Sequence, residues 1–476
     1  MSKHVQAIVT TLTIVTISRN TRLVVSDKQT ASSMASPPPS PDADRRFREL
    51  YARPPDFKAL SRLDPDFAAV AKGRELDFSD PKAVMQLTKT LLRLDFGLEM
   101  HLPDTRLCPP VPNRHNYILW LKDLLDTSSY SKPGRELTGL DIGTGASCIY
   151  PLLGCVQRPW SFIATDIDDE SLRFARNNVE RNGLSGRIRL VARSPGDPLI
   201  PLDELGIASI DFAMTNPPFY ESEEQLLRSA QRKRRPPWTA CTGAKTEMVT
   251  PGGEAAFVDA MFAESLRLRG RVQWYTAMLG FLSSLAGFVD KLRGAGVGNY
   301  AVTEFVQGAK TRRWGVAWSF AAMRPAGHAA RGTRAALLSR NLLPAASEAE
   351  MEVPRAGAGA ETEAAEDRAR VVAALSARLA AAMAALDLLS WEWDDAALEG
   401  VGRAPDKVWA RAWRRRTKRG RDGAPAQGGP AGAFGFAVWI RASAARASLG
   451  CRWLEGFDPA VFESFQGFLR RVVEGA

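Results

Sequence analysis

The stretch Leu140-Asp141-Ile142-Gly143-Thr144-Gly145-Ala146-Ser147 decides the fold class of this chain. It starts as an apolar strand and runs into a segment that can open a helix. Gly143 and Gly145 allow a sharp turn that brings backbone amides close to a ligand. Asp166 follows about twenty residues later, where a carboxylate can accept hydrogen bonds from the ribose of a nucleoside cofactor. The pattern predicts a Rossmann-like α/β domain, and a dinucleotide-binding domain satisfies it equally well.

Around this stretch, apolar strand-like runs alternate with amphipathic runs from residue 45 to residue 324, which is typical of a mainly parallel sheet. Helices are expected at 171–182 and 254–268. The expected strands are 139–142, 161–165, 188–192, 210–215 and 272–279, completed by a reversed hairpin of 300–306 and 313–320.

A second motif, Asn216-Pro217-Pro218-Phe219, directly follows the apolar strand at 210–215. An exocyclic amine is a poor nucleophile, because its lone pair is delocalised into the ring. The Asn216 side-chain oxygen and the Pro217 carbonyl can accept hydrogen bonds from both amine hydrogens. The two prolines hold the backbone extended, and Phe219, with Tyr220, offers a face for stacking an extruded base.

The order of the glycine loop, Asp166 and the Asn216 motif favours a methyltransferase that uses S-adenosylmethionine and acts on a conjugated amine. The alternative for the tetrapeptide is an ordinary Asn-Pro-Pro turn at the end of a buried strand. A sulfonium methyl donor needs positioning more than a strong base, so the chemistry requires no metal. Four histidines and five cysteines without paired metal spacing agree with an expectation of no metal site and of reduced thiols.

The chain of 476 residues carries 63 Lys and Arg against 53 Asp and Glu, a formal charge of +10 that suits an anionic partner. No apolar run is long enough to span a bilayer, so no membrane partner is expected. Two basic clusters are candidate nucleic-acid contacts, and Trp409 and Trp413 beside the second could stack bases. A solvated loop is the alternative for the first cluster and a nuclear import signal for the second. The clusters are Arg232, Lys233, Arg234 and Arg235, and the segment 407–421 with Arg414, Arg415 and Arg416.

The regions outside the first domain differ in composition. Residues 1–44 are expected to be a disordered or targeting extension, either a transit peptide or a stretch before a second start at Met34. Residues 325–368, rich in Ala, Gly, Glu and Pro, are expected to be a disordered linker. Residues 369–476 show helical spacing, a strand-like run at 435–440 and a final apolar helix, and predict a small α+β domain with a polar insertion around 420–432.

The chain resembles the methyltransferase-like protein sixteen family, RNA adenine methyltransferases that act on U6 small nuclear RNA. The resemblance covers roughly residues 45–320. It is carried by the two motifs above and by further blocks: Pro54-Pro55-Asp56-Phe57, the run 89–98, Val111-Pro112-Asn113-Arg114, the run 141–154, Thr303-Glu304-Phe305 and Arg313-Trp314 with Ala317-Trp318-Ser319-Phe320.

The resemblance implies a seven-stranded domain in which Asn216, Pro217, Pro218 and Phe219 are catalytic. It implies that Arg114 holds the cofactor's carboxylate and that the other cofactor-binding residues are Asp141, Gly143, Thr144, Gly145, Asp166 and Asn216. It implies an RNA groove that includes Arg45, Arg46, Arg48 and Arg53, and an RNA-binding role for the C-terminal domain. The family's lysine-bearing loop after the third strand reads Arg193-Ser194-Pro195-Gly196-Asp197 here, so the resemblance does not extend to regulation by that loop.

The resulting expectation is a nuclear enzyme that methylates an adenine amine in structured RNA, U6 small nuclear RNA above all. Ribosomal RNA adenine, DNA adenine and a protein glutamine amide present the same planar amine and stay open as substrates. An RNA-binding scaffold that keeps the fold is the alternative from another class. A cytoplasmic pool and mitochondrial targeting by the N-terminal extension are open alternatives for localisation, and the oligomeric state is not predicted.

Overall fold

The structure, a computed structural model, describes residues 41–73, 75–225, 244–307, 311–332, 340–353, 361–419, 433–443 and 446–475. The expectations for residues 1–40, for the basic run 232–235 and for the insertion around 420–432 lie outside these ranges. Helix α1 (Pro41–Glu49) begins before residue 45, so an extension reaching to residue 44 is wrong for its last four residues. Asp42 and Asp44 form the first turn of this helix and pair with Arg45 and Arg48 one turn later.

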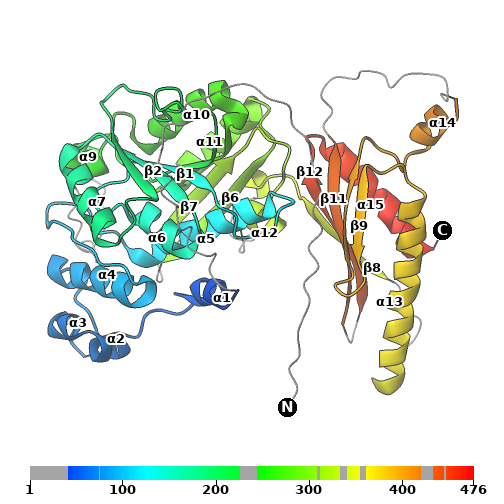
Figure 1. The fold of residues 1–476 in the computed structure, drawn as a ribbon, viewed down its shortest axis with the longest axis horizontal. Coiled ribbons are helices and arrows are strands. Elements are labelled where there is room, and N and C mark those ends of the chain that lie inside the picture. Colours follow the sequence, from blue (N-terminus) through cyan, green and yellow to red (C-terminus); the bar gives the residue numbers. More distant parts are fainter. Residues whose placement is uncertain are drawn as a thin grey trace, which may run out of the picture. The chain divides into compact units, whose positions relative to one another are not determined.

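A seven-stranded sheet forms the first part of the molecule, in the order β3-β2-β1-β4-β5-β7-β6 (Figure 1). The first five strands in this order, β3, β2, β1, β4 and β5, are parallel to one another. Strand β7 is antiparallel to both β5 and β6. The predicted strands and the reversed hairpin are confirmed. They are β1 (Thr138–Ile142), β2 (Ser161–Asp166), β3 (Ile188–Ala192), β4 (Ile210–Thr215), β5 (Val272–Leu279), β6 (Tyr300–Gln307) and β7 (Thr311–Trp318).

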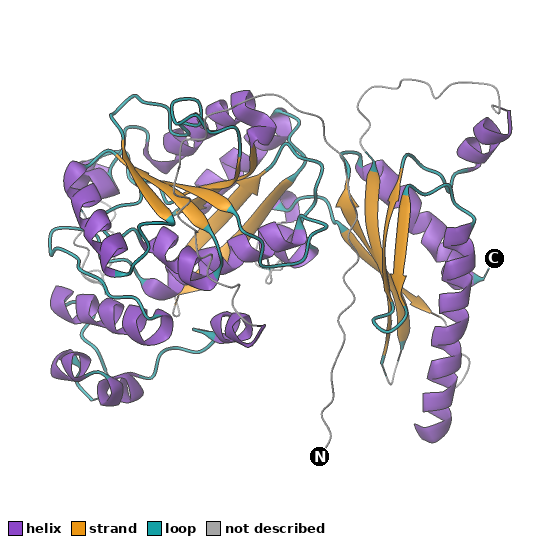
Figure 2. Ribbon diagram, viewed as in Figure 1, coloured by secondary structure: helices purple, strands orange, loops and turns teal. Residues whose placement is uncertain are grey.

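Helices cover both faces of this sheet (Figure 2), and adjacent strand residues enter opposite cores. Phe162 and Phe212 pack on one side, while their neighbours Ile163 and Ala213 pack on the other. Gly139 of β1 makes room for the Phe212 ring, because a Cβ there would lie 2.3 Å from it. The helices are α2 (Phe57–Leu63), α3 (Pro65–Val70), α4 (Pro81–Phe96), α5 (Val111–Thr127), α6 (Ile149–Gln157), α7 (Asp169–Arg181), α10 (Gly253–Leu268) and α11 (Leu282–Gly294), with the short α9 (Lys245–Met248).

A separate five-stranded antiparallel sheet follows, in the order β8-β12-β11-β10-β9. Its own core joins Phe436 of the sheet to Leu375 and Phe465 of the helices, which confirms the predicted small α+β unit. The elements are β8 (Glu348–Val353), α13 (Glu361–Ala384), β9 (Ser390–Asp394), β10 (Glu399–Ala404), α14 (Arg411–Arg419), β11 (Phe434–Ala442), β12 (Ala447–Glu455) and α15 (Pro459–Glu474).

The prediction of a disordered linker over 325–368 is wrong for its described residues. Helix α12 (Gly327–Arg331) packs on the first domain, where the carbonyl of Ala329 accepts a hydrogen bond from the Trp120 indole at 2.8 Å. Leu343 lies in the core of that domain, and its carbonyl accepts a hydrogen bond from the Tyr300 hydroxyl. Further on, β8 is an edge strand of the second sheet. The composition misled because scattered alanines and single apolar residues bury surface without visible periodicity.

Candidate active site

The candidate site lies where three parallel strands end side by side. Ile142 at the end of β1 is in register with Thr165 of β2 and with Thr215 of β4. The next residues along each strand are therefore Gly143, Asp166 and Asn216, the residues that the two sequence motifs contain. Parallel pairing thus brings together residues as far apart in the sequence as Gly143 and Asn216, as expected at the carboxyl edge of such a sheet.

The glycine loop turns tightly at this edge. Gly143 and Gly145 have φ of +74° and +63°, a backbone conformation that favours glycine. The space beside Gly143 is open, since no atom lies within 4 Å of the position that a Cβ would occupy. The N–H of Gly145 donates to the Asp166 carboxylate at 2.8 Å, so the predicted ribose-binding acid holds the loop. Asp141 is completely buried, and neither of its carboxylate oxygens accepts a hydrogen bond from a described residue. Burial raises the pKa of Asp141 to about 7.

The side chain of Asn216 offers an acceptor to a ligand. Its side-chain oxygen is buried and accepts no hydrogen bond from the described residues. A buried amide oxygen normally has a partner, since leaving one unsatisfied costs about 1–3 kcal/mol. Phe219 lies close by and packs against Gly280, where a Cβ would come within 3.0 Å of the ring. A planar NH₂ substrate needs such an acceptor, and Phe219 of the same motif adds an aromatic ring.

Arg114 of α5 is buried, as its predicted role requires. Its guanidinium lies 5.5 Å from the Tyr150 ring centroid and donates to the sulfur of Met278 at 3.4 Å. Sulfur is a weak acceptor, so the guanidinium keeps donors for a carboxylate ligand. The side-chain oxygen of the preceding residue, Asn113, is also buried and accepts no hydrogen bond from a described group.

Two charged residues outside the predicted set, Arg313 and Glu254, lie at the Asn216–Phe219 motif. The Arg313 guanidinium lies 4.9 Å from the Phe219 ring centroid, and burial lowers the pKa of Arg313. The Glu254 carboxylate is buried and accepts hydrogen bonds from the N–H groups of Gly280 and Phe281. It fixes the turn beneath the Phe219 ring. Arg313 belongs to one of the sequence blocks that carry the family resemblance, and this block could have identified it as a candidate site residue.

The arginines predicted for the RNA groove are mostly engaged within the chain. Arg48 pairs with Asp44 and Asp123, and the Arg46 guanidinium donates to the Asp95 carbonyl. Arg45 forms one exposed pair with Asp42, a kind of contact worth little. Arg53 is exposed. The structure therefore places these side chains on the N-terminal helical surface but brings none of them to the strand ends.

The second predicted cluster lies on α14, where Arg414 and Arg415 are exposed. The Arg416 side chain and residues 232–235 lie outside the described part. Trp409, which was expected to stack bases, is a core residue that packs against Phe434 and Phe465. Trp413 is partly buried, and its indole N–H donates to Asp387.

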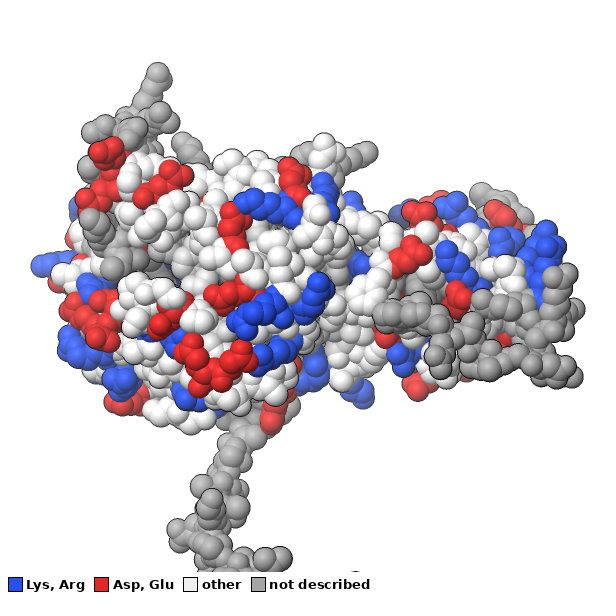
Figure 3. Space-filling model, turned by 90° about the horizontal axis from the view of Figure 1, so that it is seen from above, with Lys and Arg blue, Asp and Glu red and all other residues white. Residues whose placement is uncertain are grey.

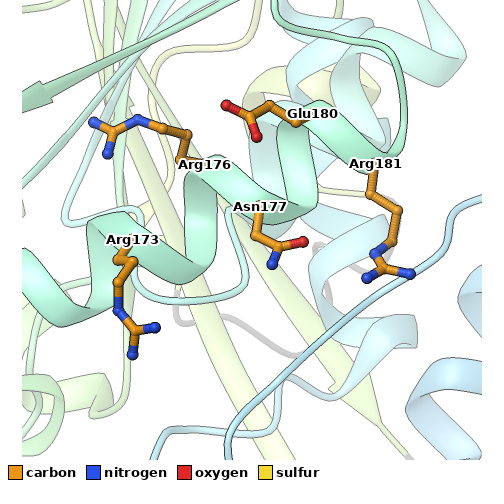
Figure 4. A pocket seen from close by; sticks show the side chains of 5 residues that line it. All are labelled: Arg173, Arg176, Asn177, Glu180 and Arg181. Carbon is orange, nitrogen blue, oxygen red and sulfur yellow. The ribbon is translucent and has the colours of Figure 1, made fainter.

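A shallow surface cleft lies on α7 (Figure 4), away from the strand ends. Two of its three arginines have an acid nearby: Arg173 lies 3.9 Å from Glu170, and Arg181 lies 3.8 Å from Glu99. Basic and acidic side chains also alternate over the face in Figure 3. We therefore interpret the cleft as a solvated face of α7. Among the described residues, no cluster of His, Cys, Asp and Glu could hold a metal, and no helix is long and apolar enough to cross a membrane.

Comparison with known proteins gives matches over the first domain. A family model described as RNA methyltransferase matches residues 42–322. U6 small nuclear RNA (adenine-(43)-N(6))-methyltransferase of Schizosaccharomyces pombe is 45% identical over 257 residues, 54% of this chain and 65% of that protein. RNA N(6)-adenosine-methyltransferase METTL16 of Homo sapiens is 44% identical over 58% of this chain and 50% of that protein. The chain thus spans about half to two thirds of the length of these relatives.

A solved structure agrees with the sequence matches. The crystal structure of the hMettl16 catalytic domain in complex with MAT2A 3'UTR hairpin 1 superposes with a TM-score of 0.51 at 44% identity. The match covers 56% of this chain and 92% of that chain. The similarity therefore includes nearly the whole of that catalytic domain and leaves the second sheet of this chain outside it.

Proposed function

We propose that this chain, which belongs to the RNA methyltransferase family, transfers a methyl group from S-adenosylmethionine to the exocyclic amine of an adenosine in structured RNA. The observation that carries the proposal is the buried, unpartnered side-chain oxygen of Asn216 beside Phe219 at the carboxyl edge of the sheet. The names of the relatives, which describe adenine methylation in RNA, support the choice of substrate.

The described residues around the glycine loop fit the cofactor. Asp141 supplies buried acceptors without partners, Gly143 leaves open space beside a positive φ, and Arg114 keeps donors for a carboxylate. When bound, S-adenosylmethionine supplies an electrophilic methyl group. Asp166 would hold its ribose hydroxyls, with Gly145 and Thr144 forming the loop against it.

The catalytic contribution of the chain is orientation of the amine. The Asn216 oxygen accepts a hydrogen bond from one amine hydrogen, and the Pro217 carbonyl accepts one from the other, which reduces delocalisation of the nitrogen lone pair into the ring and makes the nitrogen more nucleophilic. Phe219 stacks on the extruded base, and Arg313 over the ring fixes its orientation. Proton loss follows methyl transfer, so no strong base is required of the site.

The RNA is inferred to be structured, with the target adenine unpaired or bulged, because extracting such a base costs least. U6 small nuclear RNA is the first candidate, since relatives are named for it, and a nuclear location goes with that substrate. The C-terminal sheet and the arginines of α14 are proposed to contact the RNA backbone.

The test is transfer of labelled methyl groups from S-adenosylmethionine to U6 RNA, followed by identification of N(6)-methyladenosine. Ribosomal RNA, duplex DNA and a glutamine-containing peptide serve as competing substrates in the same assay. Transfer to U6 RNA by the wild type and its loss in Asn216→Ala support the proposal. Cofactor binding without transfer to any of these would instead favour a scaffold.

A further inference from the structure

The short helix α9 (Lys245–Met248) connects the cofactor loop to the catalytic motif. The Oε2 atom of Glu247 accepts hydrogen bonds from the backbone N–H of Leu107 at 2.9 Å and of Ala244 at 2.8 Å. The carbonyl of the next residue, Met248, accepts a hydrogen bond from the N–H of Tyr220 at 3.1 Å. The segment thus contacts both the chain before α5 and the residue that follows Phe219.

The same carboxylate faces the glycine loop. Its other oxygen, Oε1, lies 3.6 Å from the position that a Cβ on Gly145 would occupy. The Asp166 carboxylate accepts the hydrogen bond from the N–H of the same glycine. Burial raises the pKa of Glu247, and the Asp166 charge contributes in the same direction. Two partly buried acids therefore flank one glycine, and Oε1 accepts no hydrogen bond from a described residue.

The two acids are desolvated and repel each other, and Arg106, whose charge also acts on Glu247, pairs with Asp168 and Glu170. A donor-rich ligand between the two acids would lower the cost of holding both charges at one loop. The methyl donor carries such groups in its ribose diol and its ammonium. We propose that Glu247 is a cofactor-binding residue that accepts a hydrogen bond from one of these groups. Through α9 it also links cofactor binding to the position of Tyr220. This inference rests on the proposed function, because it assumes that the glycine loop holds this cofactor.

The link to Tyr220 runs through the backbone. The N–H of Tyr220 donates to the Met248 carbonyl, and the Tyr220 carbonyl accepts a hydrogen bond from the N–H of Thr250 at 3.0 Å. Tyr220 and Val249 thereby form a parallel β-bridge. Its ring packs edge-on against Phe281 with centroids 6.2 Å apart. Anchoring Glu247 to the cofactor therefore limits the movement of α9, and with it the backbone that follows Phe219.

Calorimetry on the full chain tests the contact. Glu247→Gln removes the charge at nearly constant shape and is expected to weaken binding of S-adenosylhomocysteine roughly tenfold, as for a lost charge-assisted hydrogen bond. Glu180→Gln, on the exposed face of α7, makes the same charge change away from the site and is expected to bind as the wild type does. Binding of methylthioadenosine identifies the group: it lacks the ammonium, so equal affinity for both proteins assigns the ammonium, and a tenfold loss assigns the ribose.

Hydrogen exchange tests the coupling. In the wild type, S-adenosylhomocysteine is expected to slow exchange of the Tyr220 and Thr250 amides, and in Glu247→Gln this protection is lost even at saturating ligand. Binding by Glu247→Gln within twofold of the wild type, with the same protection, would overturn the inference. Glu247→Asp, expected to bind weakly but to fold, separates misfolding from loss of contact. Absence of binding by the wild type itself would overturn the proposed function instead.

Discussion

The two sheets of this molecule differ in the residues that fill their interiors. In the seven-stranded sheet, parallel strands end together and leave Asp141 and Asn216 buried with acceptors that no described residue satisfies. In the five-stranded antiparallel sheet, the strand interior is closed by apolar and aromatic side chains such as Phe436, and charges pair at the surface, as Arg441 does with Glu399. The carboxyl edge of the first sheet therefore offers acceptors to a ligand, whereas the core of the second sheet is filled by its own apolar side chains.

The largest effect should come from breaking the core of the second sheet. Phe436 is completely buried and packs on Phe465 with ring centroids 4.4 Å apart. Phe436→Ala is expected to lower the free energy of unfolding of this unit by about 3–5 kcal/mol. Denaturant unfolding followed by tryptophan fluorescence should show the loss. If the sheets are independent, cofactor binding stays unchanged; a parallel loss of binding would show that they fold as one unit.

The next effect concerns the ligand-dependent sheet. Asn216→Ala removes the acceptor for the amine and is expected to lower the rate of methyl transfer by about 10²–10³-fold, the amount typical of one oriented hydrogen bond in a transition state. Single-turnover transfer with labelled cofactor measures it. Because that acceptor is unsatisfied without ligand, the substitution should leave thermal stability unchanged or higher. A marked fall in stability would mean that Asn216 has a structural role.

A smaller effect should follow from the pH dependence of Asp141. Its pKa is raised from 3.8 to about 7 in the folded chain, so the folded state binds a proton more tightly than the unfolded one. The corresponding stability is present below pH 3.8 and is lost as pH rises towards 7. The cofactor-free wild type should therefore lose stability relative to Asp141→Asn between pH 4 and 8, on the order of 1–3 kcal/mol. Parallel melting curves across this range would contradict the assignment.

The smallest effect is expected on the surface of the second sheet. Replacing Arg414 and Arg415 of α14 by glutamine should lower RNA affinity only a few-fold and reduce the slope of log affinity against log salt by about 1 per lost phosphate contact. Filter binding at several salt concentrations measures both quantities. The double variant Arg470→Gln with Arg471→Gln, at two exposed positions of α15, is the matched control. An unchanged slope in the double variant would remove α14 from the RNA interface.

The sequence predicted the first sheet well because its strands are short apolar runs that end in motifs with specific chemistry. Gly143, Asp166 and Asn216 were placed at one edge by strand order alone, and the register of β1 with β2 and β4 confirms this. The residues that support the site were harder to find. Glu254 acts through backbone amides of another strand end, and no spacing in the sequence reveals which amides those are.

The weaker predictions share a physical cause. Arg46 and Arg48 resemble an RNA-binding stripe in the sequence, but tertiary contacts supply Asp123 and the Asp95 carbonyl as partners. Trp409, which stands beside a basic run, is a core residue. Sequence reports which groups are charged or aromatic, whereas only packing decides which of them remain available to a partner.

Helix α12 and Leu343 have a practical consequence for anyone who shortens this protein. The family match ends at residue 322, and a fragment cut there would expose the Trp120 indole and the Tyr300 hydroxyl. The indole would lose its acceptor, the hydroxyl would keep only the Arg293 guanidinium as a partner, and the apolar faces beside them would favour aggregation. A soluble catalytic fragment should therefore extend to about residue 344, past Leu343 and before β8.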